Sequence, residues 1–173
     1  FDGASSRASF DLAFSSYGTI GWLSSIDAWA DGVASILAPG GKLVLLEFHP
    51  LIWSFGPDGR ITEPYFIDQP LQESGVNDYI GGTGADLTPS GWSEGVVDFE
   101  NPEPSVGYQW TTGQIVTALA RAGLQIETLR EYPYANGCAI FEGMRRLPER
   151  RFGMPEGVPA MPLMLGVVAR RPL

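Results

Sequence analysis

The sequence predicts an α/β fold, and three observations lead to that prediction. Short apolar segments typical of buried strands alternate with segments whose apolar residues recur at helical spacing. One such segment, Lys42–Phe48, is almost continuously apolar, which is typical of a parallel strand covered on both faces. Apolar residues make up 44% of the 173, enough for one domain with a single core.

A strand, a helix and a second strand are predicted for residues 10–48. Phe10–Phe14 is short, largely apolar and bounded by Ser and Gly, so we expect a buried strand there. A helix follows, with Ser24 or Ser25 as its N-cap. Its apolar face consists of Ile26, Ala30, Val33 and Leu37. The turn at residues 39–41, Pro-Gly-Gly, ends this helix and leads into the strand Lys42–Phe48.

A second helix is predicted over Gly113–Ala122. Thr111 or Thr112 provides its N-cap, and Gly123 closes it. The apolar face of this helix consists of Ile115, Val116, Leu119 and Ala122.

Two further strands are predicted, at Leu124–Tyr132 and at Pro162–Arg170, with an Arg-rich connector, Pro133–Met161, between them. In open α/β sheets, ligands bind beyond the carboxyl ends of the strands. The segments in which we expect functional residues are therefore Ser15–Trp22 and Phe48–Trp53, which follow the first two strands.

Residues 49–110 differ from the rest of the chain. They hold seven of the 14 prolines, nine of the 22 glycines and nine of the 20 aromatic residues, and neither strand nor helix periodicity persists in them. A disordered linker would lack so many aromatic residues. We therefore expect an ordered, loop-rich insertion that caps a site.

The charge of the chain is concentrated in this insertion. Twenty acidic and 11 basic residues give a net charge of −9, and residues 49–110 contain ten of the acids and one base, Arg60. An acidic chain with a single lysine lacks the basic surface of a nucleic-acid-binding protein. No apolar run approaches the roughly 18–20 residues of a membrane span. One Cys and one His disfavour a metal site, so we expect no metal. The single cysteine and the absence of a long apolar run together lead us to expect a cytoplasmic protein.

Several short motifs together resemble class I S-adenosylmethionine-dependent methyltransferases. They comprise Phe10–Gly18, Gly21–Leu23 and Leu37–Leu45. A subgroup of bacterial small-molecule methyltransferases is suggested by Glu47–Pro50, Glu131–Tyr134 and Pro162–Met164. The resemblance implies a Rossmann-like methyltransferase sheet in which the four predicted strands are strands four to seven. The insertion then lies between strands five and six, within a partial methyltransferase domain over residues 1–173.

The family binds its cofactor with a Gly-rich loop and an acidic residue that both precede the fourth strand. The chain therefore resembles the C-terminal half of such an enzyme, and about 80–100 upstream residues are expected from the length of βαβ units. Without a neighbouring strand, residues 10–14 would form an open apolar edge, and such edges pair with other chains. We expect a homodimer through this strand, or aggregation.

The resemblance implies that Ser15, Ser16, Tyr17, Gly18 and Trp22 border S-adenosylmethionine. Glycine allows a ligand close to the backbone, and hydroxyl groups can bind its polar atoms. The alternative is an ordinary strand-to-helix turn rich in Ser and Gly.

His49 is the only histidine of the chain, and it follows a strand on the expected ligand side. With a pKa near neutrality, it could remove a proton from a substrate hydroxyl or amine as general base. The alternative is a structural histidine that binds a loop carbonyl. Glu47 points to the opposite face from Phe48 and can anchor a loop.

Methyl transfer depends mainly on alignment and on exclusion of water. Aromatic residues of the insertion could therefore bind the substrate, and we name Trp53, Tyr65, Tyr108 and Trp110. Alternatively, these side chains form the insertion's own core. The acidic insertion favours neutral or cationic small substrates. Two other functions remain open: a nucleotide-dependent oxidoreductase, and a non-catalytic binding module.

Overall fold

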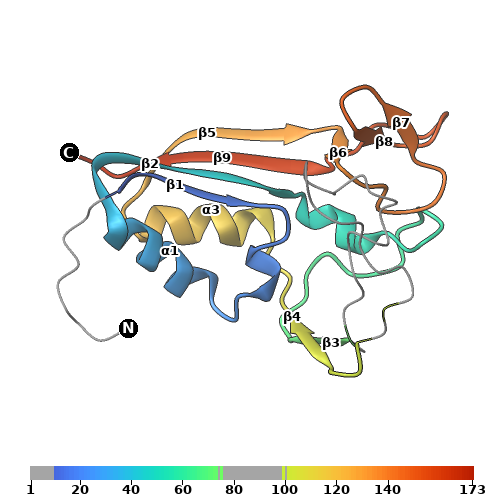
Figure 1. The fold of residues 1–173 in the computed structure, drawn as a ribbon, viewed down its shortest axis with the longest axis horizontal. Helices are drawn as coiled ribbons and strands as arrows, with labels where there is room; N and C mark the ends of the chain where they lie inside the picture. The colour runs from blue at the N-terminus through green and yellow to red at the C-terminus, as the bar shows by residue number, and fades with distance from the viewer. Residues whose placement is uncertain (1–9, 74, 76–98, 100) are drawn as a thin grey trace.

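A four-stranded mixed sheet forms one layer of the protein (Figure 1). The structure is a computed structural model that describes residues 10–73, 75, 99 and 101–173. The strand order across the sheet is β1 (Phe10–Ser16), β2 (Leu37–Phe48), β9 (Met164–Arg170) and β5 (Gln125–Tyr132). β1 is parallel to β2, whereas β9 is antiparallel to both β2 and β5. The four predicted strands are all present, with ends shifted by a few residues. The expectation that Phe10–Phe14 is buried is wrong, because β1 is an outer strand of the described sheet and Phe10 and Phe14 are 54% and 63% exposed.

Two helices, α1 (Ile26–Ile36) and α3 (Thr112–Arg121), lie on the same face of this sheet (Figure 1). The main core lies between them and the sheet, and its fully buried members include Ala30, Leu43, Leu45, Ile115, Leu119, Leu165 and Val167. Each strand contributes alternate residues to this layer because successive side chains of a strand point to opposite faces.

Both helices begin at side-chain caps. The Ser25 side chain accepts a hydrogen bond from the N–H of Ala28. Thr111 and Gln114 form a capping box, in which the Thr111 hydroxyl accepts from the Gln114 N–H and the Gln114 side chain accepts from the Thr111 N–H. Of the cap alternatives drawn from the sequence, Ser25 and Thr111 are therefore the caps.

The junction between α1 and β2 differs from the prediction. The strand begins at Leu37, five residues before Lys42, and Leu37 is fully buried as part of the sheet rather than of the helix. The Pro-Gly-Gly turn lies inside the strand as a bulge beside Phe10. A Cβ atom on Gly41 would lie 2.8 Å from the Ala38 carbonyl oxygen and 2.9 Å from that of Phe10, so the bulge requires glycine there.

The sequence predicts that both faces of β2 are covered, but in the part of the chain that the structure describes the second face of the sheet is not. Among the described residues, no helix packs on it. It carries a shallow groove of about 410 Å³ lined by Phe14, Val44, Leu46, Arg130, Tyr132, Val168 and neighbouring residues. The side chain of Phe14 is 63% exposed at its margin.

The Arg-rich connector contains a small antiparallel sheet that was not predicted from the sequence. Its strands, in spatial order, are β6 (Tyr134–Asn136), β8 (Arg151–Gly153) and β7 (Arg145–Leu147). A second core lies against it and contains Ile52, Ala135, Phe141, Met154 and Leu163. Three-residue strands are too short to show a period, and the contacts of this second core stabilise them.

The insertion is described mainly at its two ends, because residues 74, 76–98 and 100 lie outside the described residues. Its first end holds a 3₁₀ helix, η2 (Pro50–Ser54), and β3 (Leu71–Glu73) pairs antiparallel with β4 (Ser105–Gly107). Across the described ranges, the search for helices that are long and apolar enough to cross a membrane finds none.

Candidate functional site

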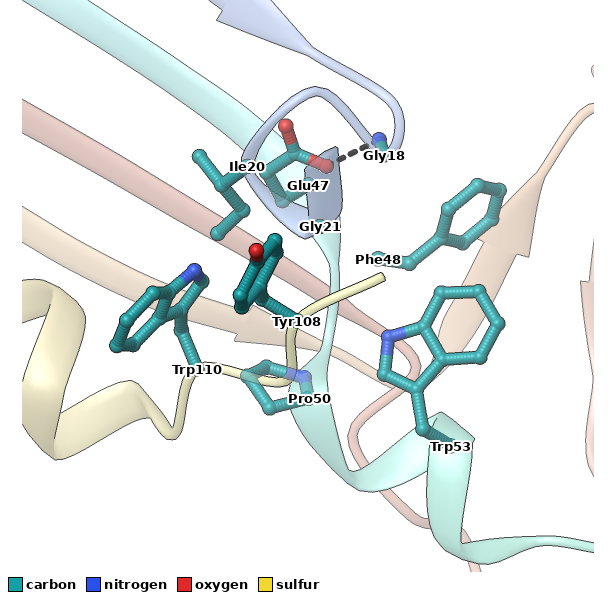
Figure 2. A pocket seen from close by; sticks show the side chains of 9 residues that line it. All are labelled: Gly18, Ile20, Gly21, Glu47, Phe48, Pro50, Trp53, Tyr108 and Trp110. Carbon is teal, nitrogen blue, oxygen red and sulfur yellow. Dashed lines mark hydrogen bonds between the residues drawn. The ribbon is translucent and has the colours of Figure 1, made fainter. Parts of the chain in front are cut away.

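A narrow pocket of about 30 Å³ lies where β1 and β2 end, on the side of the sheet that the sequence predicts for ligand binding (Figure 2). Its walls come from the segment after β1, the end of β2, η2 and the segment before α3, and are formed by Gly18, Ile20, Gly21, Glu47, Phe48, Pro50, Trp53, Tyr108 and Trp110. A pocket of this volume accepts a group of about the size of a water molecule or a methyl group.

Two aromatic side chains on the segment before α3 form one wall of the pocket. The rings of Tyr108 and Trp110 are stacked, with centroids 6.3 Å apart and planes inclined by 13°. The Trp110 indole N–H donates to the Leu23 carbonyl at 3.1 Å, and the Tyr108 N–H donates to the Gly21 carbonyl at 2.8 Å. These bonds attach the aromatic segment to the 3₁₀ helix η1 (Ile20–Trp22), so the wall has a fixed position.

Glu47 also lines this pocket, and it is only 1% exposed. Its carboxylate accepts a hydrogen bond from the backbone N–H of Gly18 (Figure 2) and a second one from that of Thr19 at 3.0 Å. Burial raises the pKa of this carboxyl above its usual value, and the backbone N–H groups offset part of that rise. The interpretation that Glu47 anchors a loop is therefore confirmed.

His49 stands in the chain between two lining residues of the pocket, Phe48 and Pro50, and is 5% exposed. The Leu51 N–H donates to its Nδ1 atom at 3.1 Å, which places the ring proton on Nε2. Nε2 in turn lies 2.9 Å from the Glu131 carboxylate and 3.3 Å from the Thr112 hydroxyl. Burial lowers the pKa of His49, and the Glu131 carboxylate counteracts part of that shift.

Both ring nitrogens of His49 are thus engaged by the protein. The Nδ1 lone pair accepts from Leu51, and the Nε2 proton faces Glu131. A general base needs a free lone pair that can reach the substrate. The predicted catalytic role of His49 therefore requires one of these two contacts to open, and it stays a prediction.

The structure brings four of the predicted ligand-binding residues to one pocket. Gly18, predicted to border the cofactor, lines it together with Trp53, Tyr108 and Trp110, which were predicted to bind the substrate. These four residues come from three separate segments of the chain.

The remaining predicted residues lie outside the lining of this pocket. Ser15 has a buried hydroxyl, and Ser16 accepts a hydrogen bond from Thr19 through its carbonyl. The other three are aromatic: Tyr17 packs edge-on against Phe48, Trp22 is 48% exposed, and the Tyr65 hydroxyl accepts from the Thr112 N–H. Their predicted ligand contacts stay predictions.

Sequence reasoning missed Glu131 and Thr112 as the partners of His49. They are separated from it by 82 and 63 residues, so no local pattern connects them. One signal was available: Glu131 stands near the carboxyl end of a predicted strand, as His49 does.

Comparison with solved structures defines the fold class. The chain resembles an S-adenosylmethionine-dependent methyltransferase from Mesorhizobium loti with 22% identity and a TM-score of 0.52, covering 95% of this chain and 64% of that one. A proposed methyltransferase of the same kind from Listeria monocytogenes gives 17% identity and a TM-score of 0.59, with coverage of 99% and 66%. A third, from Methanosarcina mazei, shares 14% identity with a TM-score of 0.50, and the match covers 96% of this chain and 61% of that one.

The chain therefore has the α/β fold of S-adenosylmethionine-dependent methyltransferases, and it spans less than two thirds of the length of these three structures, 61–66%. No family model matches the sequence. No curated protein matches it either.

Proposed function

We propose that the protein takes part in methyl transfer from S-adenosylmethionine to a small molecule. The observation that carries this proposal is the shared pocket, in which Gly18 of the expected cofactor loop meets the aromatic rings of Trp53, Tyr108 and Trp110. The fold likeness agrees with it. The pocket has about the size of the transferred group, so most of the cofactor and most of the acceptor would be bound outside it.

The lining fits a positively charged methyl donor. Aromatic ring faces attract cations, and among the pocket-lining residues none is basic. Gly18 adopts φ +90° and has no atom within 4 Å of the position of a Cβ, so the backbone is open to a ligand at this point. S-adenosylmethionine supplies a methyl group on a sulfonium, and the neutral thioether that remains after transfer is a good leaving group.

The residues of this chain would then align the reactants and exclude water. The stacked pair Tyr108 and Trp110 is held to η1 by backbone and indole hydrogen bonds, so it presents a rigid apolar wall. Trp53 is 52% exposed and stands at the rim, where it can close over an acceptor. Such alignment accelerates an in-line displacement without acid–base chemistry. A neutral or cationic acceptor suits the acidic chain and the aromatic lining.

Calorimetric titration tests the proposal against its main rival. S-adenosylhomocysteine and a nicotinamide dinucleotide are titrated separately into the full-length protein. We expect S-adenosylhomocysteine to bind and the dinucleotide not to bind. Binding of the dinucleotide alone would identify a nucleotide-dependent oxidoreductase instead, and binding of neither would favour a non-catalytic module.

A matched pair of variants tests the place of binding. Gly18 and Gly157 both have positive φ, at +90° and +78°, and neither has an atom within 4 Å of a Cβ position. Gly18→Leu and Gly157→Leu therefore impose similar backbone strain. We expect only Gly18→Leu to abolish binding of S-adenosylhomocysteine, and equal affinities would contradict the assigned site.

The general-base prediction for His49 is tested separately. Where methyl transfer to an acceptor is measurable, His49→Ala with unchanged turnover would remove the base role and leave methyl transfer intact. A fall of about 10²-fold or more in turnover, with the affinity for S-adenosylhomocysteine retained, would support it.

A further inference from the structure

The loop that follows β1 makes an unusual turn. Tyr17 has φ +54° and Gly18 has φ +90°, so two successive residues are in the left-handed region. For tyrosine this conformation is unfavourable, and it persists only where surrounding contacts hold it. The Tyr17 N–H donates to the Leu46 carbonyl at 2.9 Å, which fixes the start of the turn.

The rest of the turn is held by one carboxylate. The N–H groups of Gly18 and Thr19 both donate to the carboxylate of Glu47, the penultimate residue of β2. Successive backbone N–H groups in such a turn form an anion-binding concavity. In this protein the buried Glu47 side chain fills that concavity, and the same carboxylate borders the pocket (Figure 2).

Although Glu47 borders the pocket, its contacts do not suit it to act on a reacting group. Its oxygens are engaged by backbone donors, so its hydrogen-bonding capacity is directed at the loop rather than at a reacting group. Burying a carboxylate at 1% exposure without such donors would lower the stability of the fold, because an unpaired charge loses its hydration. The contacts therefore stabilise each other: the carboxylate holds the strained turn, and the turn satisfies the carboxylate.

We propose that Glu47 is a positioning residue whose carboxylate fixes residues 17–20 in the conformation that receives the cofactor. The inference rests on the proposed function for its second half, the binding of S-adenosylmethionine at this loop. Its first half, the control of the loop conformation, is independent of that function.

The test compares Glu47→Gln with Glu127→Gln. Both changes remove one carboxylate at nearly constant volume. The amide introduced by Glu47→Gln would turn an N–H₂ group toward a backbone donor. Glu127, by contrast, makes only partly exposed ion pairs with Lys42 and Arg170, at 2.9 and 2.8 Å, at the other end of the sheet. Glu47→Asp, which keeps the charge but is one methylene shorter, serves as a second variant if Glu47→Gln does not fold.

Amide hydrogen exchange by NMR is the first readout, measured without any ligand. We expect exchange at Gly18 and Thr19 to become at least about tenfold faster in Glu47→Gln, while Leu45 in β2 keeps its protection. Glu127→Gln should leave all three amides unchanged. Unchanged exchange at Gly18 and Thr19, or an equal loss of protection at Leu45, would overturn the inference.

The affinity for S-adenosylhomocysteine, measured by calorimetry, is the second readout. We expect Glu47→Gln to weaken it about tenfold and Glu127→Gln to leave it unchanged. A loosened loop with unchanged affinity would overturn the positioning role and leave the proposed methyl transfer intact. If the wild-type protein does not bind S-adenosylhomocysteine, the proposed function fails, and the exchange data still decide whether Glu47 controls the loop.

Discussion

The Nε2 atom of His49 lies 2.9 Å from the Oε1 atom of Glu131, and this contact joins the end of β2 to the end of β5. Thr112, at the start of α3, adds its hydroxyl at 3.3 Å from the same nitrogen. At the end of the sheet that carries the pocket, three elements therefore meet at one imidazole. Burial lowers the pKa of this imidazole and so favours its neutral form.

The titration of His49 should reflect this burial. We expect the imidazole to titrate below its usual value of 6.5. Because the pKa is lower in the folded than in the unfolded protein, His49 contributes stability that is fully present above pH 6.5 and is lost as the pH falls through the folded pKa. His49 is the only histidine, so its imidazole C–H signals in NMR report the value directly. A midpoint at or above 6.5 would contradict the prediction.

Glu131→Gln should lower the pKa of His49 further. The glutamine oxygen still accepts from Nε2, but the negative charge that favours the imidazolium is lost. The same NMR titration measures the shift. Glu127→Gln, which changes a carboxylate remote from this site, should leave the midpoint in place, and a rise in Glu131→Gln would show that the carboxylate does not act on His49 in this way.

The capping box at the start of α3 predicts a measurable loss of stability. Thr111→Ala removes the side chain that accepts from Gln114, and we expect it to lower the free energy of unfolding by about 1 kcal/mol. Urea denaturation measures the change. Thr117→Ala is the matched control because Thr117 is exposed in the interior of the same helix. An equal effect of the two substitutions would mean that the cap contributes nothing.

The exposed strand β1 is expected to pair with a second copy of the chain. It lies at the edge of the sheet, and Phe10, Leu12 and Phe14 are 54%, 60% and 63% exposed. Leu12→Lys places a charge on this edge and should shift the protein from dimer to monomer in sedimentation experiments. Ile61→Lys adds the same charge outside this edge, at a residue that is 64% exposed, and it should not change the oligomeric state. A wild-type monomer at micromolar concentration would rule out the pairing.

The sequence by itself determined the elements of the main sheet. Continuous apolar runs marked β1, β2 and β9, and helical spacing with a Thr cap and a closing Gly marked α3, because these signals depend on residues close together in the chain. Strand alternation also separated Glu47 from Phe48. The sequence motifs predicted Gly18 and the composition of the insertion predicted the aromatic residues as ligand-binding candidates, although neither distinguished pocket residues from their neighbours.

Only the tertiary structure decided which of these residues meet. The carboxylate of Glu47 contacts amides 28 and 29 residues away, and His49 meets Glu131 across 82 residues. The small sheet of β6, β7 and β8 likewise depends on a second core whose members are far apart in the chain. Such contacts follow from strand order and register, which bring distant segments to the same edge of the sheet, and local periodicity contains no information about that order.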